Sequence, residues 1–242
     1  MTIGRKIIHL EVVDSTNNYT ANLIKEGQLE SGTVILADNQ YAGRGQRSSE
    51  WSVNPGENLT FSVFIDNVNL SVDRQFVLTQ IVSLSLVKLL TNFGLDAQVK
   101  WPNDIYCNGR KLAGVLIENQ LQGKVVKSSI VGVGINLNQE QFDGFDATST
   151  KKETGMHRMP REVVFGFIDA FNTCWSNFLT NHQLLQEKYL EELYRLNMIS
   201  RYEDADGQFD GQILNVLENG MLVVLKNGSE VHYDLKELRF IS

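Results

Sequence analysis

Residues 98–118 read QVKWPNDIYCNGRKLAGVLIE, and this stretch decides how the middle of the chain folds. Apolar residues flank the Asn-Gly pair at 108–109, in which both residues tolerate positive φ, so the stretch predicts a tight β-hairpin. Such a hairpin would hold Asn103, Asp104 and Lys111 near one another. An Asp beside a Lys in a pocket could bind a metal–nucleotide complex, whereas an exposed pair would be an ordinary ion pair of little energetic value. Taken alone, the stretch favours the second interpretation.

Outward from the hairpin, the residue patterns indicate an α+β body with a mixed sheet flanked by helices. Strands are expected at 33–37, 59–65 and 125–138, and helices at 19–26 behind a capping cluster at 14–17, at 73–93, at 160–178 and at 184–196. Beyond 197 the pattern changes, because Asp-Gly and Asn-Gly turn signals recur every eight or so residues, which is typical of a small all-β unit or barrel. The sequence therefore predicts two domains, 1–197 and 198–242, the smaller docked on the larger.

The composition excludes several classes of protein. The 242 residues contain 22 Lys and Arg against 29 Asp and Glu, a formal charge of −7, which disfavours unspecific nucleic-acid binding. Two cysteines are too few for a disulfide framework, and the start of the chain has no long apolar segment, so a cytoplasmic, non-membrane protein is expected. The four histidines have no metal-ligand spacing, and no metal site is assigned.

Two glycine-containing stretches are candidates for ligand contact. The loop 43–51 reads GRGQRSSEW, where small residues free backbone N–H groups and arginines offer forks for phosphate or carboxylate. It lacks the ending of a P-loop, and a solvated surface loop is the equally weighted alternative. The stretch 132–138 reads GVGINLN, and glycines within an apolar strand mark a close approach of another group. The residues alone therefore predict a pocket for a small anion such as a nucleotide.

Five motifs, taken together in order and spacing, resemble the biotin protein ligases. They are Ser15-Thr16-Asn17, Gln40 with Ala42-Gly43-Arg44-Gly45, Lys100 to Asp104, Gly109 to Glu118, and Gly132 to Asn136. Ala147-Thr148-Ser149 resembles a later, weaker motif of that family. The resemblance implies a class II synthetase-like fold with a C-terminal Src-homology-3-like β-barrel.

The resemblance also implies a two-step reaction. Biotin and MgATP would form biotinyl-5′-AMP, and a lysine of a biotin carboxyl carrier protein would then take the biotin. Lys111 and Arg44 are implied as the catalytic cations. The implied biotin contacts are Ser15, Thr16, Asn17, Gln40, Gly43, Arg44, Gly45, Gln46, Lys111 and Gly114, and the implied nucleotide contacts are Trp51, Lys100, Asn103, Asp104 and Asn136.

The chain departs from the family pattern in its loop, where Gln46, Ser48 and Ser49 replace an Arg, a Gly and an Arg. The thinner positive charge predicts looser retention of the adenylate. Because the catalytic pattern begins by about Ile7, a DNA-binding repressor role is disfavoured.

Three other functions stay open at this point. A lipoate– or octanoate–protein ligase shares the implied fold and lysine chemistry. A non-catalytic biotin sensor is a second alternative, but the presence of Arg44 and Lys111 argues against it, because binding alone needs less positive charge than catalysis at a phosphate. RNA binding by the C-terminal unit is disfavoured, because residues 207–242 contain three Lys and Arg against five Asp and Glu. The sequence does not choose between a monomer and a homodimer.

Overall fold

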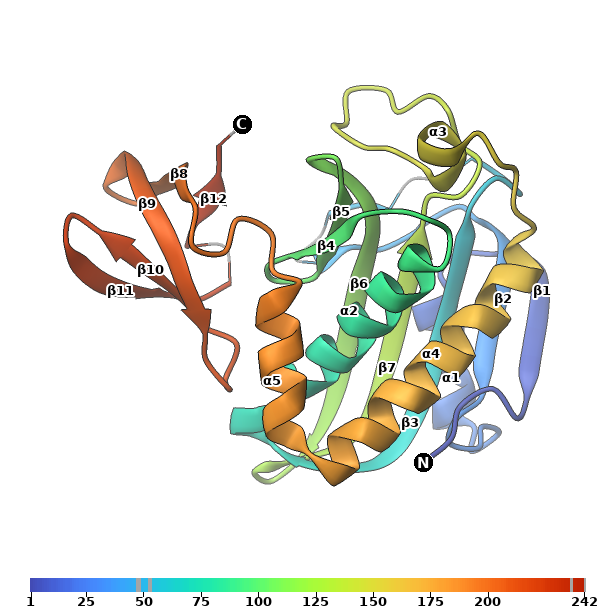
Figure 1. Cartoon of the computed structure of the whole chain (residues 1–242). Helices are drawn as coiled ribbons and strands as arrows, with labels where there is room; N and C mark the ends of the chain where they lie inside the picture. The colour runs from blue at the N-terminus through green and yellow to red at the C-terminus, as the bar shows by residue number, and fades with distance from the viewer. Residues whose placement is uncertain (47–48, 52–53, 236, 242) are drawn as a thin grey trace.

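The computed structural model describes residues 1–46, 49–51, 54–235 and 237–241. A seven-stranded sheet runs through the body of these described residues in the order β1-β2-β3-β7-β6-β5-β4 (Figure 1). Its strands are β1 (Ile7–Val13), β2 (Val34–Gln40), β3 (Leu59–Ser71), β4 (Ala97–Lys100), β5 (Asp104–Cys107), β6 (Arg110–Gln122) and β7 (Val125–Ile135). The pair β1–β2 is parallel and the other neighbours are antiparallel, which confirms the predicted mixed sheet.

The hairpin predicted at 108–109 joins β5 to β6. Asn108 and Gly109 have φ values of 49° and 74°, the left-handed conformation that both residues tolerate. Across the hairpin Asp104 pairs with Gly114, and Tyr106 pairs with Lys111. The hairpin therefore brings Asp104 and Lys111 to the same region of the sheet.

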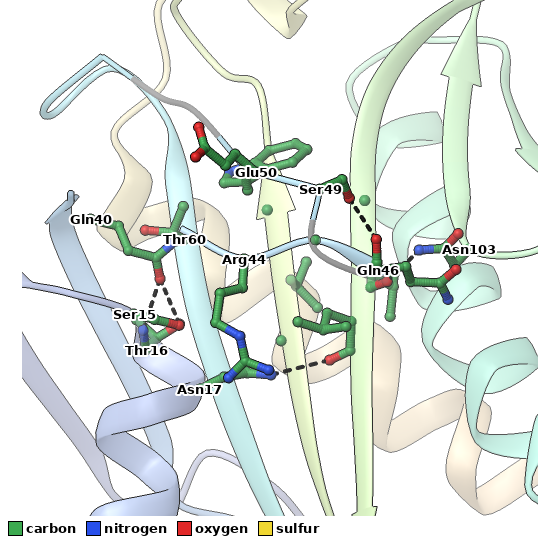
Figure 2. Close-up of a pocket in the computed structure, with 18 of the residues that line it drawn as sticks. Ser15, Thr16, Asn17, Gln40, Arg44, Gln46, Ser49, Glu50, Thr60 and Asn103 are labelled. Carbon is green, nitrogen blue, oxygen red and sulfur yellow. Dashed lines mark hydrogen bonds between the residues drawn. The ribbon is translucent and has the colours of Figure 1, made fainter. Parts of the chain in front are cut away.

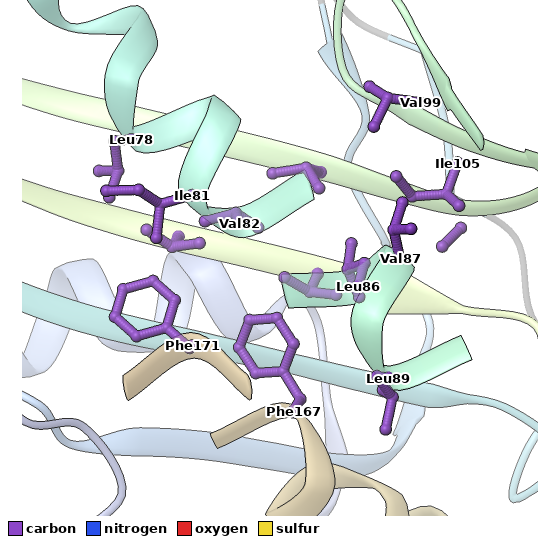
Figure 3. Packing of buried hydrophobic residues seen from close by; sticks show 14 of the residues in the cluster. Leu78, Ile81, Val82, Leu86, Val87, Leu89, Val99, Ile105, Phe167 and Phe171 are labelled. Atoms are coloured by element: carbon purple, nitrogen blue, oxygen red, sulfur yellow. The ribbon is translucent and has the colours of Figure 1, made fainter. Parts of the chain in front are cut away.

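Helices cover the sheet and close the core. They are α1 (Thr16–Lys25), α2 (Phe76–Thr91), α3 (Thr150–Thr154), α4 (Pro160–Thr180) and α5 (His182–Glu191), with a short 3₁₀ turn at Val72–Arg74. Figure 1 shows α2 and α4 crossing one face of the sheet. Between them, Ile81 and Leu86 of α2 meet Phe167 and Phe171 of α4 in a fully buried layer (Figure 3). The helix expected at 73–93 is therefore part of the buried core.

Side chains alternate across a strand, so β7 divides its residues between two environments. Val131 and Val133 belong to the apolar core. Gly132 and Gly134 lie on the opposite face, where α1 packs on β7 and β3. That second face carries the candidate functional site.

The last helix of the body differs from the prediction. A helix was expected at 184–196, but α5 begins at His182 and ends at Glu191. The chain leaves the helix because the Val99 N–H donates to the Glu192 carbonyl at 2.7 Å and the Tyr194 N–H donates to the Val99 carbonyl at 2.8 Å. Pairing with a distant strand thus replaces the last helical turn, which no local pattern could reveal.

A second sheet follows, antiparallel throughout, in the order β11-β10-β9-β8-β12. Its strands are β8 (Ile199–Asp204), β9 (Gly207–Val216), β10 (Leu222–Lys226), β11 (Ser229–Tyr233) and β12 (Arg239–Phe240). Its strands match the predicted small β unit, and its β9–β10 turn contacts the body. The Trp101 indole N–H donates to the Gly220 carbonyl at 2.8 Å. Gly220 also packs so closely on Phe76 that a Cβ there would lie 2.6 Å from the ring.

None of the described helices combines the length and the apolar character that crossing a membrane requires.

Candidate functional site

The motifs from distant parts of the sequence line one pocket of about 220 Å³ (Figure 2). The predicted site residues among its lining are Ser15, Thr16, Asn17, Gln40, Arg44, Gly45, Gln46, Trp51, Asn103, Asp104, Lys111 and Gly114. The lining also includes Ser49, Glu50, Thr60, Val115, Leu116, Gly132, Val133 and Gly134. This volume is below the roughly 300–1,000 Å³ of typical small-molecule pockets. The bulky Trp51 indole is among the side chains that line the pocket.

One end of the pocket is a buried polar network at the start of α1. The Gln40 side-chain carbonyl accepts from the Thr16 backbone N–H at 2.8 Å and from the Thr16 hydroxyl at 3.1 Å, as Figure 2 shows. The Ser62 hydroxyl lies 2.7 Å from the Thr16 hydroxyl and 2.6 Å from Asn17 Oδ1. Because buried polar groups are retained only when they are paired, this network fixes the directions of the groups that face the pocket.

The structure corrects the predicted cap of this helix. Ser15 occupies the N-cap position in extended conformation, but within the described chain its hydroxyl accepts no N–H of the helix. Gln40 of β2 supplies that acceptor instead, from 24 residues away in the sequence. Ser62, also part of the network, was missed; its polar side chain within the apolar strand 59–65 was the signal that could have found it.

The two strand glycines make room for groups inside the pocket, as their position in an apolar strand predicted. A Cβ on Gly132 would lie 2.4 Å from Asn17 Oδ1. A Cβ on Gly134 would lie 2.3 Å from the Trp51 indole. Within the described residues, the Trp51 indole N–H is buried and has no hydrogen-bond partner, so it is a donor available to a ligand.

The other end of the pocket carries the charged hairpin pair. The Lys111 ammonium lies 2.7 Å from Asp104 Oδ1 and 5.7 Å from the centre of the Trp51 ring. The side chains of Lys111 and Asp104 are 34% and 17% exposed, so the pair faces the pocket and is partly shielded from water. Asn103 is held beside it because its amide donates to the Val115 carbonyl at 2.6 Å.

In the loop 43–51, the described residues 43–46 and 49–51 pair with one another. The Gly45 N–H donates to the Ser49 carbonyl at 2.7 Å, and the Trp51 N–H donates to the Gly43 carbonyl at 3.0 Å. Arg44 reaches down from the loop, and its guanidinium donates to Asn18 and to Glu118, each at 2.5 Å. Ser48, one of the three residues at which this loop departs from the family pattern, lies outside the described residues.

Three predicted site residues lie outside the lining of this pocket. The Lys100 ammonium lies between two aromatic rings, 4.9 Å from the centre of Tyr106 and 5.0 Å from that of Phe240, and burial lowers its pKa. The Asn136 amide donates to the Thr148 carbonyl at 3.0 Å and so holds the strand to the segment before α3. Gly43 lines an adjoining hollow, and a Cβ on it would lie 2.2 Å from the Trp51 carbonyl oxygen.

Among the described residues, no three His, Cys, Asp or Glu side chains gather as they would around a metal ion. The pocket thus joins an end with a hydrogen-bonded polar network, beside which Arg44 is bonded to Asn18 and Glu118, to an end with the Lys111–Asp104 pair. A ligand with a polar uncharged head and an anionic tail matches that arrangement.

The fold and the pocket are those of a protein ligase that activates a carboxylic acid, and the match to a protein-family model supports this class. The model described as the biotin/lipoate A/B protein ligase family matches residues 9–136, more than half of the chain, and the chain belongs to that family.

Individual relatives extend the similarity beyond that segment. The bifunctional ligase/repressor BirA of Bacillus spizizenii is 30% identical over 230 residues, covering 92% of this chain and 70% of that protein. The biotin–[acetyl-CoA-carboxylase] ligase of Paracoccus denitrificans is 33% identical over 127 residues, 51% of each chain. The biotin protein ligase of Aquifex aeolicus, solved in complex with biotin and ATP, superposes with a TM-score of 0.82 at 25% identity, covering 98% of this chain and all of that one.

Proposed function

We propose that this chain is an ATP-dependent biotin–protein ligase that activates biotin as biotinyl-5′-AMP and transfers it to a lysine of a biotin carboxyl carrier protein. The observation that carries the proposal is one pocket with a buried polar network at one end and the Lys111–Asp104 pair at the other. Membership of the family and the names of the relatives support biotin as the acid that is activated.

The polar end is the proposed site of the biotin head. A cyclic urea needs an acceptor for its N–H groups and donors for its carbonyl. Asn17 Oδ1 faces the pocket beside Gly132, and hydroxyls of Ser15 and Thr16 line the same end. These groups are buried, so a ligand that left them unpaired would bind poorly. The valeryl chain of biotin would then run along Val115 and Leu116 toward Lys111.

The charged end is the proposed site of adenylation. A biotin carboxylate oxygen attacks the α-phosphorus of ATP, the bond to the β-phosphate oxygen breaks, and pyrophosphate leaves. The barrier is raised by repulsion between carboxylate and triphosphate, and the preorganised cations Lys111 and Arg44 reduce that repulsion. Asp104 keeps the Lys111 ammonium in position, and Trp51 covers the pocket against water.

Magnesium enters this proposal as part of the substrate MgATP. Mg²⁺ in nucleotide sites keeps several waters and is held by one or two carboxylates together with phosphates. A single pocket carboxylate at the hairpin, Asp104, with no cluster of three ligands among the described residues, fits a metal that arrives with the nucleotide. Asp104 would be its protein contact, and the metal would neutralise phosphate charge.

The second step needs a path for the acceptor lysine. Its amine attacks the acyl carbon of the adenylate, AMP leaves, and the nitrogen loses a proton. A neighbouring hollow shares Gln46, Asn103 and Val115 with the main pocket. Phe76 and Leu235 give it apolar walls and Asp234 an acidic one, and no lining residue described there is basic. Such a hollow suits a lysine side chain better than a polyphosphate.

Two further points belong to the same proposal. We assign residues 1–197 to the catalytic domain and 198–242 to a C-terminal domain, since the two sheets have separate strand orders. A cytoplasmic location is supported by the two cysteines, Cys107 and Cys174, which are both unbridged.

The proposal is tested by pyrophosphate release. The protein with MgATP should release pyrophosphate only when biotin is added, and biotinyl-AMP should be detected by mass. The variant Lys127→Ala, which removes an exposed lysine of β7, should behave like the wild type. Release with lipoate or octanoate but not with biotin would move the protein to the other branch of the family, and no release with any acid would contradict ligase activity.

A further inference from the structure

Glu118, near the middle of β6, bonds both to Arg44 of the loop 43–51 and to Asn17 at the start of α1. Its Oε1 accepts from the Arg44 guanidinium at 2.5 Å, and its Oε2 accepts from the Asn17 amide at 2.8 Å. Glu118 does not itself line the main pocket; it lines an adjoining hollow that shares Arg44 and Gln40 with it. One carboxylate thus contacts two pocket residues from behind.

The bond to Asn17 sets which way that amide faces. With its NH₂ group committed to Glu118, Asn17 must direct Oδ1 toward the pocket, where the Ser62 hydroxyl donates to it at 2.6 Å and Gly132 leaves space. If the amide were reversed, its oxygen would face the Glu118 carboxylate, acceptor against acceptor, and Glu118 would lose its donor. Glu118 therefore selects an acceptor, not a donor, for the ligand at this point of the pocket.

The bond to Arg44 fixes the position of that cation in the protein without ligand. Its second guanidinium nitrogen donates to Asn18 at 2.5 Å, so the side chain is fixed between α1 and β6 rather than left in solvent. The Arg44 and Glu118 side chains are 43% and 35% exposed, and such exposed pairs contribute little to stability. A phosphate that arrives can therefore share the guanidinium with Glu118 at little energetic disadvantage.

We propose that Glu118 is a positioning residue of the adenylation reaction, which aligns the Asn17 amide for the acid's head group and holds the Arg44 guanidinium between α1 and β6 until it binds phosphate. This inference rests on the proposed function. It adds a residue that acts through two others, Asn17 and the implied catalytic cation Arg44.

The variant Glu118→Gln separates this role from simple packing. A glutamine has the same shape, but its single oxygen can accept from Arg44 or from Asn17, not from both, and its NH₂ group then faces another donor. We expect the biotin KM to rise and kcat to fall, with kcat/KM for biotin-dependent pyrophosphate release roughly tenfold to a hundredfold lower, as for loss of a hydrogen bond to a charged group. Biotinyl-AMP should also leave the enzyme faster.

Two controls make the test specific. Glu11→Gln changes an exposed glutamate of β1 in the same sheet and should leave the biotin KM, kcat and the rate of biotinyl-AMP release unchanged. In an Arg44→Ala background, Glu118→Gln should lose part of its effect, because only the Asn17 contact remains to be broken. Where Glu118→Gln does not fold, as judged by its thermal melt, Glu118→Asp gives the same comparison, since the shorter carboxylate cannot reach both partners.

The outcomes distinguish the inference from the function on which it rests. Wild-type protein without biotin-dependent pyrophosphate release would refute the proposed function. An active wild type, with Glu118 variants as active as Glu11→Gln or with equal losses in the presence and absence of Arg44, would refute the positioning role alone.

Discussion

Replacing Gly132 by alanine tests the close approach of β7 to the Asn17 side chain in the pocket. The new Cβ would lie 2.4 Å from Asn17 Oδ1, about 1 Å short of the ordinary contact that begins near 3.4 Å. Gly132 is not among the residues with positive φ, so the backbone itself tolerates alanine. The Asn17 side chain must therefore move, and it breaks its bonds to Ser62 and Glu118 when it does so.

The size of the effect follows from that displacement. Overpacking of this kind typically destabilises by about 1–3 kcal/mol. Because Asn17 can swing away in the free protein but, in the proposed binding mode, has to return to contact biotin, most of this energy is lost from binding. Since each 1.4 kcal/mol is a factor of ten, the biotin Kd measured by calorimetry should rise roughly tenfold to a hundredfold.

A double-mutant cycle decides whether the contact with Asn17 is the cause. In an Asn17→Ala background the clashing atoms are gone, so adding Gly132→Ala should change the Kd by less than about threefold. Gly166→Ala in α4, where the Cβ would meet only the Leu89 side chain, should leave the Kd at its wild-type value. A Gly132→Ala protein that binds biotin normally, or an equal loss with and without Asn17, would refute the reasoning.

Three further substitutions test the Lys111 cation, the bond that joins the two sheets and an ion pair of the C-terminal sheet. Lys111→Ala should abolish adenylate formation, and pyrophosphate release within tenfold of the wild type would contradict the role of that cation. Trp101→Phe removes the 2.8 Å bond to the Gly220 carbonyl and should reduce the free energy of unfolding by about 1 kcal/mol in urea melts; an unchanged melt would show that this bond does not hold the C-terminal sheet. The hydrogen bond from Lys226 lowers the pKa of Asp204 below 3.8, so its stabilising contribution is present above that pH and is lost as the pH falls through the lowered pKa. Asp204→Asn should therefore flatten the acid limb of a pH series of thermal melts, and a limb as steep as that of the wild type would count against the pair.

Local sequence signals were sufficient for much of the fold. The Asn-Gly pair at 108–109 needs no tertiary partner to favour positive φ, and the helical stripe at 73–93 reports burial directly, so both predictions held. The end of α5 could not be predicted, because backbone pairing of Tyr194 with Val99 decides it. Competition between a helix and a strand far away in the sequence leaves no local pattern.

In the candidate site, too, local sequence signals predicted some contacts, while others depend on tertiary packing. Spacing along the hairpin was enough to place Asp104 beside Lys111. Asn103 and Asp104 of the motif 100–104 line the pocket, whereas the Lys100 ammonium lies near the Phe240 ring of the C-terminal sheet, a contact that exists only after the two sheets have packed together. The acceptor that caps α1 comes from Gln40, and its pairing with Thr16 exists only after β2 and α1 have packed together.

The most direct test of the central claim is the intact mass of a biotin carboxyl carrier domain after incubation with this protein, MgATP, and biotin or lipoate in parallel. We expect a gain of one biotin per carrier domain, absent without ATP and absent with Lys111→Ala. A gain with lipoate alone, or no gain with either acid despite tight binding of biotin, would contradict it.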